Sequence, residues 1–303
     1  MSSSHQDEQV RWKAALDELP ATPDNIPIFF FSHGSPMLAY PESQQQGPLG
    51  AFLKDFGPVL LQKYQPKGIV VFSAHWETQG QRLVTDYGDS NPLLMDYYGF
   101  PPELYRLKFD SRGDSALSER VVELFKEAGH KARTSGKKEA RGMDGRGFEG
   151  SGLDHGVFVP FRLMFGEEFR DIPIVEVSID SSLSPEANWD IGRAVKKLRQ
   201  EGILVLSGGL LVHNLRDRSC WSLETAKAEH KEFAKAILEA VRAPEAEERK
   251  ARLVALTQHI GFRASHPREE HFIPLYVAGG GGEEGAVKVL CDLYGIPTFA
   301  FGL

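Results

Sequence analysis

Cysteine is scarce in this 303-residue chain, and its scarcity argues against two classes of protein. Cys220 and Cys291 are the only two cysteines, and they lie far apart without a CxxC partner. The sequence therefore predicts neither a disulfide scaffold nor a cysteine zinc site. So few cysteines also suit a reducing compartment, and we expect a cytoplasmic protein.

An excess of basic charge and a long apolar run are also missing. The chain has 35 lysines and arginines against 42 aspartates and glutamates, which gives a formal net charge of −7. This balance offers no electrostatic footprint for nucleic acid or for an anionic membrane. No run of apolar residues approaches the ~20 that a membrane span needs. We therefore expect neither nucleic acid nor a membrane as a partner.

Several short catalytic motifs are absent as well. The sequence contains no GxSxG, no GxxxxGK[ST] and no HExxH. Their absence disfavours a serine hydrolase, a P-loop nucleotidase and a zincin-type protease. Any catalytic site in this chain must therefore be found from other residue patterns.

What the sequence does contain is an alternation of apolar strands and amphipathic helices. Buried strands are predicted at residues 28–32, 68–74, 172–179 and 203–207, with helices between them. A strand, helix and strand in succession favour parallel pairing through a right-handed crossover. We expect one catalytic α/β domain over residues 21–303, with a mixed, largely parallel central sheet flanked by helices.

Three segments lie outside this pattern of strands and helices, and we predict the local structure of each. Residues 1–20 are expected to form a flexible or helical N-terminal extension. Residues 129–152 are basic, polar and rich in glycine, and they predict a long mobile loop. The glycine run 279–282 predicts a further loop.

Histidines follow three of the apolar runs within a few residues. His33 follows residues 28–32, His75 lies at the end of residues 68–74, and His213 follows residues 203–207. Ligands bind at the carboxyl ends of strands in open α/β sheets, so these histidines are placed for chemistry. Three further histidines also end apolar segments, whereas three others are expected in solvated helical settings: His155, His266 and His271 in the first group, and His130, His230 and His259 in the second.

This histidine set suits a mononuclear metal site. Neutral imidazole binds Fe, Zn, Cu or Ni, and a catalytic site needs about three protein ligands with open positions. His33 and His75 flank one strand–helix–strand unit, so their rings can converge. We expect the third ligand from residues 269–271, and only one of His266 and His271 among the ligands.

Six motifs give the chain a specific likeness. They are SHGSP (32–36), SAHWE (73–77), DYYGFPPELY (96–105), LDHGVFVPF (153–161), SGGLLVHNL (207–215) and HPREEHFIPL (266–275). In this order they resemble the class III extradiol ring-cleavage dioxygenases, in particular the LigB-like, DOPA-dioxygenase type. The resemblance implies an enzyme that opens a catechol ring beside its two hydroxyls with O2, giving a muconic semialdehyde.

The resemblance also assigns roles to residues of this sequence. It implies one nonhaem Fe(II) at the carboxyl ends of the strands, held by His33, His75 and a third ligand near residue 270. His271 is the expected third ligand and Glu270 the reserve. His213 matches the family's acid–base histidine and a possible fourth ligand, and His155 matches the histidine that holds the substrate and dioxygen oxygens. Zinc can occupy the same site in purified protein, because it binds such ligands more tightly than Fe(II).

Other residues of the motifs are expected around this site. Tyr97 and Tyr98 are expected to wall the ring pocket and to offer a hydroxyl. The residues expected to orient the histidines from behind are Ser35, Asp154 and Asn214, with His266 left open between that role and a helix-end contact.

Two other readings of the same residues stay open. Three histidines and an open position also suit a zinc hydrolase, with Glu77 or Glu270 as its base. A noncatalytic metal- or small-molecule-binding protein can use the same scaffold. The sequence is compatible with a monomer or a small homo-oligomer, and it does not identify the catechol.

Overall fold

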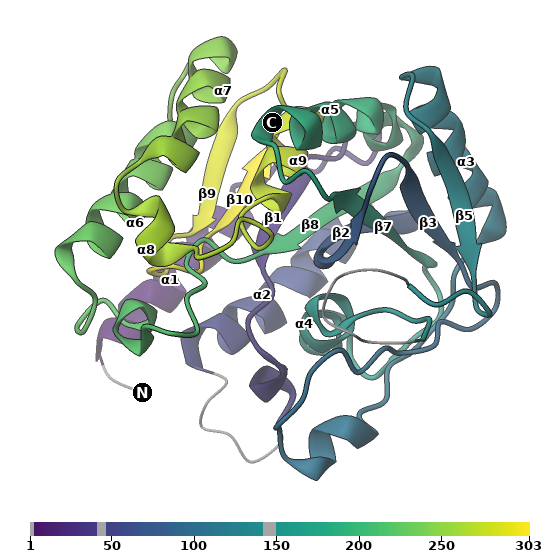
Figure 1. The fold of residues 1–303 in the computed structure, drawn as a ribbon, viewed down its shortest axis with the longest axis horizontal. Coiled ribbons are helices and arrows are strands. Elements are labelled where there is room, and N and C mark those ends of the chain that lie inside the picture. Colours follow the sequence, from purple (N-terminus) through teal and green to yellow (C-terminus); the bar gives the residue numbers. More distant parts are fainter. Residues whose placement is uncertain (1–2, 41–46, 142–149) are drawn as a thin grey trace.

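The chain forms one α/β domain around a single large sheet (Figure 1). A computed structural model describes residues 3–40, 47–141 and 150–303. In chain order its helices and strands are α1 Ser3–Asp17, β1 Ile28–Ser32, α2 Gly47–Tyr64, β2 Gly68–Thr78, β3 Arg82–Asp86, β4 Asp110–Ser111, α3 Ser115–Glu127, β5 Ala132–Gly136, α4 His155–Phe165, β6 Glu168–Phe169, β7 Ile174–Asp180, α5 Pro185–Ala194, β8 Ile203–Gly209, α6 Ala228–Val241, α7 Ala246–Ala255, α8 Phe262–Ser265, α9 Pro274–Gly281, β9 Val287–Cys291 and β10 Thr298–Phe301.

The large sheet is mixed, with a parallel centre. Its strand order is β5-β3-β7-β2-β8-β1-β10-β9, and β7, β2, β8 and β1 run parallel to one another. Antiparallel pairing appears between β3 and β7 and between β1, β10 and β9. A two-residue parallel pair, β4 with β6, lies apart. The predicted mixed, largely parallel sheet is confirmed.

Helices cover both faces of this sheet, which explains why its central strands begin with continuous apolar runs. One face packs against α1, α2 and α4, and the other against α3, α5, α6, α7, α8 and α9 (Figure 1). Every residue of β1, β2 and β8 is buried. A strand buried on both faces needs continuous apolar residues rather than alternation, which is the pattern the sequence shows.

β2 is longer than the sequence predicted, and its end is irregular. The strand continues to Thr78, but its pairing with β7 passes from Ser73 directly to Glu77. The residues between them, including His75, therefore bulge out of the regular register. Such bulges re-aim side chains near active sites. Here the bulge lies at the carboxyl edge of the parallel strands, where the sequence predicted the site.

The predicted mobile loop over residues 129–152 is wrong for part of its length. Ala132–Gly136 forms β5, an edge strand that pairs parallel with β3. An edge strand of this kind packs weakly and tolerates polar side chains, so its basic sequence hid it from an apolar pattern. Residues 142–149 of the expected loop lie outside the described residues.

The glycine run 279–282 is likewise not a loop, because its first three residues continue α9. Cβ atoms at Gly280 and at Gly192 of α5 would lie 2.0 Å from the backbone oxygens of Trp189 and Val277, respectively. The two helices therefore approach so closely that only glycine fits at these contacts. The glycines serve helix packing rather than chain reversal.

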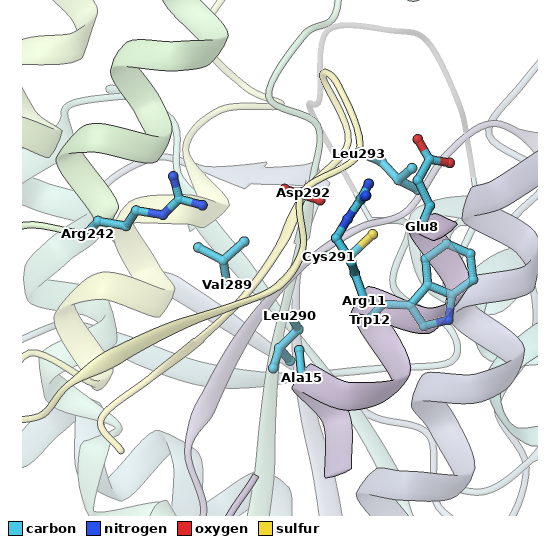
Figure 2. A pocket seen from close by; sticks show the side chains of 10 residues that line it. All are labelled: Glu8, Arg11, Trp12, Ala15, Arg242, Val289, Leu290, Cys291, Asp292 and Leu293. Carbon is cyan, nitrogen blue, oxygen red and sulfur yellow. The ribbon is translucent and has the colours of Figure 1, made fainter. Parts of the chain in front are cut away.

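The N-terminal segment forms α1 and joins the core. Trp12 is buried and its ring lies 5.9 Å from that of Phe52 in α2. A cavity of about 180 Å³ lies between α1 and the end of β9, where Trp12 and Cys291 are among the lining residues (Figure 2). No helix among the described residues is long and apolar enough to cross a membrane.

Candidate metal centre

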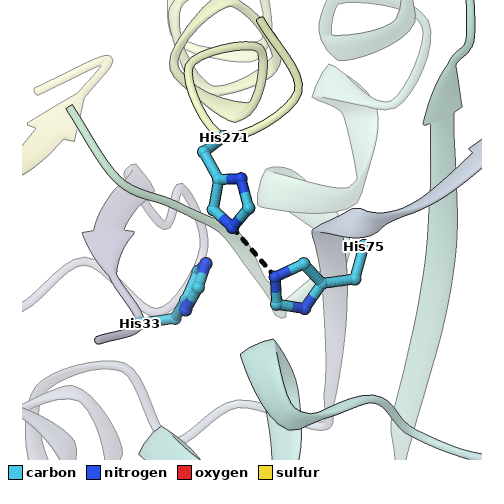
Figure 3. Close-up of side chains that lie close together, drawn as sticks. All are labelled: His33, His75 and His271. Atoms are coloured by element: carbon cyan, nitrogen blue, oxygen red, sulfur yellow. Dashed lines mark hydrogen bonds between the residues drawn. The ribbon is translucent and has the colours of Figure 1, made fainter. Parts of the chain in front are cut away.

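Three histidines from distant parts of the chain meet at the carboxyl edge of the sheet. His33 follows β1, His75 lies in the bulge of β2, and His271 precedes α9. One ring nitrogen from each lies within 4.8 Å of the others, and the three rings point toward one another (Figure 3). All three side chains are buried.

Backbone contacts bring His271 to the two strand ends. Leu210, directly after β8, donates its N–H to the carbonyl of His271 at 2.9 Å, and His33 donates its N–H to Gly209 at 3.2 Å. A Cβ at Gly209 would lie 2.4 Å from the carbonyl oxygen of His271. Gly209, the last residue of β8, therefore allows this close approach of the two backbones because it has no side chain.

The outer nitrogen of each ring contacts an oxygen. Nδ1 of His33 lies 2.7 Å from the carbonyl of Gly34, and Nδ1 of His75 lies 3.2 Å from Oδ1 of Asp154. Nδ1 of His271 lies 3.0 Å from Oε1 of Glu270. Because an oxygen acceptor holds the proton on Nδ1, each Nε2 presents a lone pair to the centre.

This donor set fits a metal ion. Nε2 of His75 and Nε2 of His271 are 3.0 Å apart, the separation expected for two imidazoles that share one ion (dashed in Figure 3). Nε2 of His33 is buried and has no hydrogen-bond partner among the described residues. Burial, followed by the neighbouring imidazoles, lowers the pKa of all three rings, which keeps them in the neutral form that binds metals.

Asp154 holds His75 from behind. Its Oδ1 also accepts from Ser73 Oγ at 2.9 Å and from the N–H of Gly156 at 2.8 Å, and its Oδ2 lies 2.9 Å from Arg141. Burial would raise the pKa of Asp154, but Arg141 and His75 outweigh it and hold that pKa well below its usual range. The orienting role expected of Asp154 agrees with these contacts.

A second carboxylate, Asp96, was not among the residues singled out from the sequence. Its Oδ1 lies 2.7 Å from Nδ1 of His155 and accepts from the backbone N–H of His155 at 2.9 Å. The His155 ring stacks on that of His75, with centroids 4.1 Å apart. Asp96 opens the aromatic motif 96–105, and a lone acid before an aromatic run was the available signal.

His213 stands beside this group rather than within it. Its ring stacks on that of His271 with centroids 3.5 Å apart, and its Nδ1 lies 3.9 Å from Oε1 of Glu270. Burial lowers the pKa of His213 to about 3, with neighbouring imidazoles adding to the effect. Glu270, the reserve ligand, contacts the outer nitrogen of His271 and does not belong to the group of three.

The histidines form the base of a cavity of about 600 Å³. Its lining residues come mainly from the segment after β1, the 96–100 segment and the segment after β8: His33, Gly34, Ser35, Pro36, His75, Asp96, Tyr97, Tyr98, Phe100, His155, Leu210, His213, Leu215, Trp221 and His271. The cavity therefore joins a polar histidine floor to a largely apolar wall, as small-molecule sites do.

The two tyrosines take different places in that wall. The Tyr97 hydroxyl donates to the carbonyl of Leu104 at 2.5 Å, so it is turned away from the cavity. The Tyr97 ring meets His155 edge to face, with centroids 5.5 Å apart. Tyr98 is largely exposed at the mouth. The expectation of a wall agrees with this placement, whereas the Tyr97 hydroxyl is committed elsewhere.

The remaining sequence candidates are spread more widely. Ser35 lines the cavity, and Asn214 fixes its own loop by donating to the carbonyl of Ala264 at 2.7 Å. His266 is buried among phenylalanine rings, with that of Phe262 5.4 Å away, outside the group of three. His230, expected in a solvated setting, is instead fully buried with Nδ1 3.0 Å from Ser265 Oγ.

Comparison with known proteins decides the family. The family model of the catalytic LigB subunit of aromatic ring-opening dioxygenases matches residues 27–303. The chain belongs to the LigB family. It is therefore an extradiol aromatic ring-opening dioxygenase, an enzyme that acts on a small molecule and O2.

Curated LigB relatives match along nearly the whole chain. A 4,5-DOPA dioxygenase extradiol-like protein of Schizosaccharomyces pombe is 41% identical, over 96% of this chain and 97% of its own. The 4,5-DOPA dioxygenase extradiol of Beta vulgaris is 31% identical, over 92% and 96%. A crystal structure of an uncharacterized Escherichia coli K12 protein shares the fold, with a TM-score of 0.65 at 24% identity, over 91% of this chain and all of the other.

Proposed function

We propose that this LigB dioxygenase binds one Fe(II) through Nε2 of His33, His75 and His271. With it the enzyme opens a catechol ring beside its two hydroxyls and gives a muconic semialdehyde. The carrying observation is the convergence of these three neutral imidazoles at the base of a cavity that also holds His155 and His213. Fe(II) held by three imidazoles, with positions left open, would supply the redox chemistry between O2 and the catecholate.

His213 is the proposed acid–base residue. It lines the cavity beside His271, and its lowered pKa leaves it neutral at physiological pH. The negative charge of a bound catecholate would raise the pKa of this ring, so the imidazole can then take the proton of the second catechol hydroxyl and return it as the O–O bond breaks. Both oxygen atoms of O2 end in the product, so the reaction needs no further reductant.

His155 is proposed to hold the oxygens of substrate and dioxygen. Asp96 holds Nδ1 of His155, which leaves Nε2 as the nitrogen available to a ligand in the cavity. The stacking of His155 on His75 places that nitrogen near the proposed metal ligands. Positioning of this kind lowers the barrier by fixing the reactants before they react.

The alternative hypothesis of a zinc hydrolase is disfavoured, because both of its candidate bases are engaged in other contacts. Glu77 forms a two-point ion pair with Arg268, with both N–O distances 2.5 Å. Glu270 lies against the outer nitrogen of His271 and 3.3 Å from Arg268. Neither carboxylate lines the cavity. Family membership and these ion pairs both favour the dioxygenase.

The test is reconstitution without oxygen. Protein stripped of metal is loaded anaerobically with Fe(II) or with Zn(II), mixed with a panel of catechols and then exposed to air. We expect a yellow ring-opened product with Fe(II) and none with Zn(II). Equal activity with both metals, or no ring-opened product from any catechol despite a loaded site, would contradict the proposal.

A further inference from the structure

Large apolar side chains are exposed to solvent at the mouth of the cavity. Tyr98 comes from the 96–100 wall and is 79% exposed, whereas Leu215 and Trp221 come from the segment after β8 and are 71% and 43% exposed. Exposed apolar side chains that gather at one place mark a surface used in binding.

These three exposed apolar residues cluster around one cavity and are not spread over the surface. Large exposed apolar residues are few among the described residues: Val10, Tyr98, Tyr105, Leu215, Trp221, Leu223 and Ile260. Tyr98, Leu215 and Trp221 line this one cavity. The Tyr105 ring lies 5.1 Å from that of Tyr97 behind the same wall. Single exposed apolar residues need no explanation, but a group around one mouth does.

The segment after β8 is held in place. Trp221 donates from its indole nitrogen to the carbonyl of Asn214 at 3.1 Å, and Asn214 in turn is fixed to Ala264. The Trp221 ring stands 6.2 Å from the ring of His213. A ligand part that extends from the histidine floor past His213 would therefore meet a rigid apolar surface.

We propose that the substrate is a catechol with an alkyl or aryl substituent, and that this substituent binds between Tyr98, Leu215 and Trp221. The inference rests on the proposed function and deepens it. A cavity of about 600 Å³ leaves room beyond a single catechol ring, since cavities of ~300–1,000 Å³ hold drug-sized ligands. The ionised amino-acid end of DOPA would lose hydration against these apolar side chains.

The test is a chain-length series. The Fe(II)-loaded enzyme is given catechol, 4-alkylcatechols from methyl to hexyl, and DOPA, and kcat/KM is measured for each. We expect kcat/KM to rise about fourfold per methylene until the substituent passes the mouth. DOPA should react less efficiently than 4-propylcatechol. A series that is flat with length, or a preference for DOPA over every alkylcatechol, overturns the proposal.

Variants locate the effect. Leu215→Ala and Trp221→Ala should each lower the hexyl-to-methyl ratio of kcat/KM about tenfold, because they remove the surface that the chain contacts. Ile260→Ala is the matched control, since Ile260 is 84% exposed and does not line the cavity. Unchanged ratios in both cavity variants would contradict the assignment.

Three outcomes distinguish the possible failures. If catechol itself is cleaved but substituent length has no effect, the substrate class is wrong and the proposed function stands. If no catechol is cleaved by the iron-loaded enzyme, both fail. If sedimentation shows that Leu215→Ala dissociates an oligomer, the apolar mouth is a contact between copies of the chain, and the proposal is overturned.

Discussion

Arg141 and Asp154 form a buried ion pair in which Nη2 of the arginine lies 2.9 Å from Oδ2 of the aspartate. The other oxygen of Asp154 contacts the His75 ring, so Asp154 links Arg141 to a proposed metal ligand. Arg141 also contacts Glu176 and lies over the Trp76 ring at 4.4 Å. One cation thus allows two neighbouring carboxylates to stay buried.

Replacing Arg141 should weaken metal binding. Burial raises the pKa of Glu176 well above its usual range even beside Arg141, so Glu176 already carries a proton in the wild type. Arg141→Met would remove the cation that holds the pKa of Asp154 low, so the pKa of Asp154 would rise. Asp154 would then accept less strongly from His75, and we expect metal affinity to fall by about tenfold. The measurement is the Kd for Co(II), obtained by competition with a chelator at pH 7.5.

Two further variants control this experiment. Arg141→Lys keeps a cation and should recover part of the affinity. Arg133→Met breaks the exposed ion pair between Arg133 of β5 and Glu139, and it should leave the Kd unchanged. A folded Arg141→Met protein with the wild-type Kd would show that the arginine only fills space.

Removing the proposed acid–base group should separate binding from turnover. His213→Ala keeps His33, His75 and His271, so one metal ion per chain should still bind. Turnover should fall by about 10² to 10⁴, the usual contribution of a positioned proton-transfer group. Product formation under saturating catechol and O2 gives the rate, with His130→Ala as a surface control. Turnover in His213→Ala within tenfold of wild type would remove the assignment.

Acid should destabilise the protein partly through His266. Burial lowers the pKa of His266 to about 4 in the folded chain, against about 6.5 when unfolded. The unfolded state therefore binds more protons between these values, so stability is full above pH 6.5 and falls as pH drops toward 4. The contribution lost is about 3 kcal/mol at pH 4.

The pH dependence can be isolated by substitution. His266→Leu has no group to protonate, so its free energy of unfolding should fall less steeply than that of the wild type between pH 6.5 and 4. Urea titrations of the metal-free proteins measure the two slopes, and the histidines that do not interact with His266 cancel in the comparison. Parallel slopes would mean that His266 titrates normally in the folded chain.

The contact between α5 and α9 should not tolerate a methyl group. Gly280→Ala would place Cβ 2.0 Å from the backbone oxygen of Trp189, so the helices must separate. We expect a loss of about 1–3 kcal/mol in unfolding free energy, as for other overpacked cores. Gly136→Ala, whose nearest neighbour would be 3.9 Å away, should change stability little. Equal denaturation midpoints for both variants would count against this packing.

Much of the fold could be predicted because its central strands are recognisable from their apolar runs. Residues 28–31 and 203–206 are continuous apolar runs, as expected of strands buried on both faces, and their spacing by helices implied parallel pairing. β5 could not be seen in this way. It is an edge strand with polar side chains, and its pairing with β3 comes from tertiary contacts that local sequence does not encode.

Some residues of the site could also be predicted from the sequence, whereas others could not. His33, His75 and His271 could be proposed because the first two follow buried strands and the motifs matched a family. Asp96 and Arg141 were missed, since their value lies in contacts with His155 and Asp154 that join distant segments. The β2 bulge that re-aims His75 was also invisible, because register emerges only when strands pair.

The most direct test of the proposed iron-dependent ring cleavage measures O2 uptake and ring-opened product together. Wild-type protein and His33→Ala, each treated anaerobically with Fe(II), receive an alkylcatechol and a known amount of O2. We predict that the wild type consumes one O2 per ring opened, and that the variant neither consumes O2 nor opens the ring. Oxygen consumption without ring-opened product, or equal ring opening by His33→Ala, would contradict this prediction.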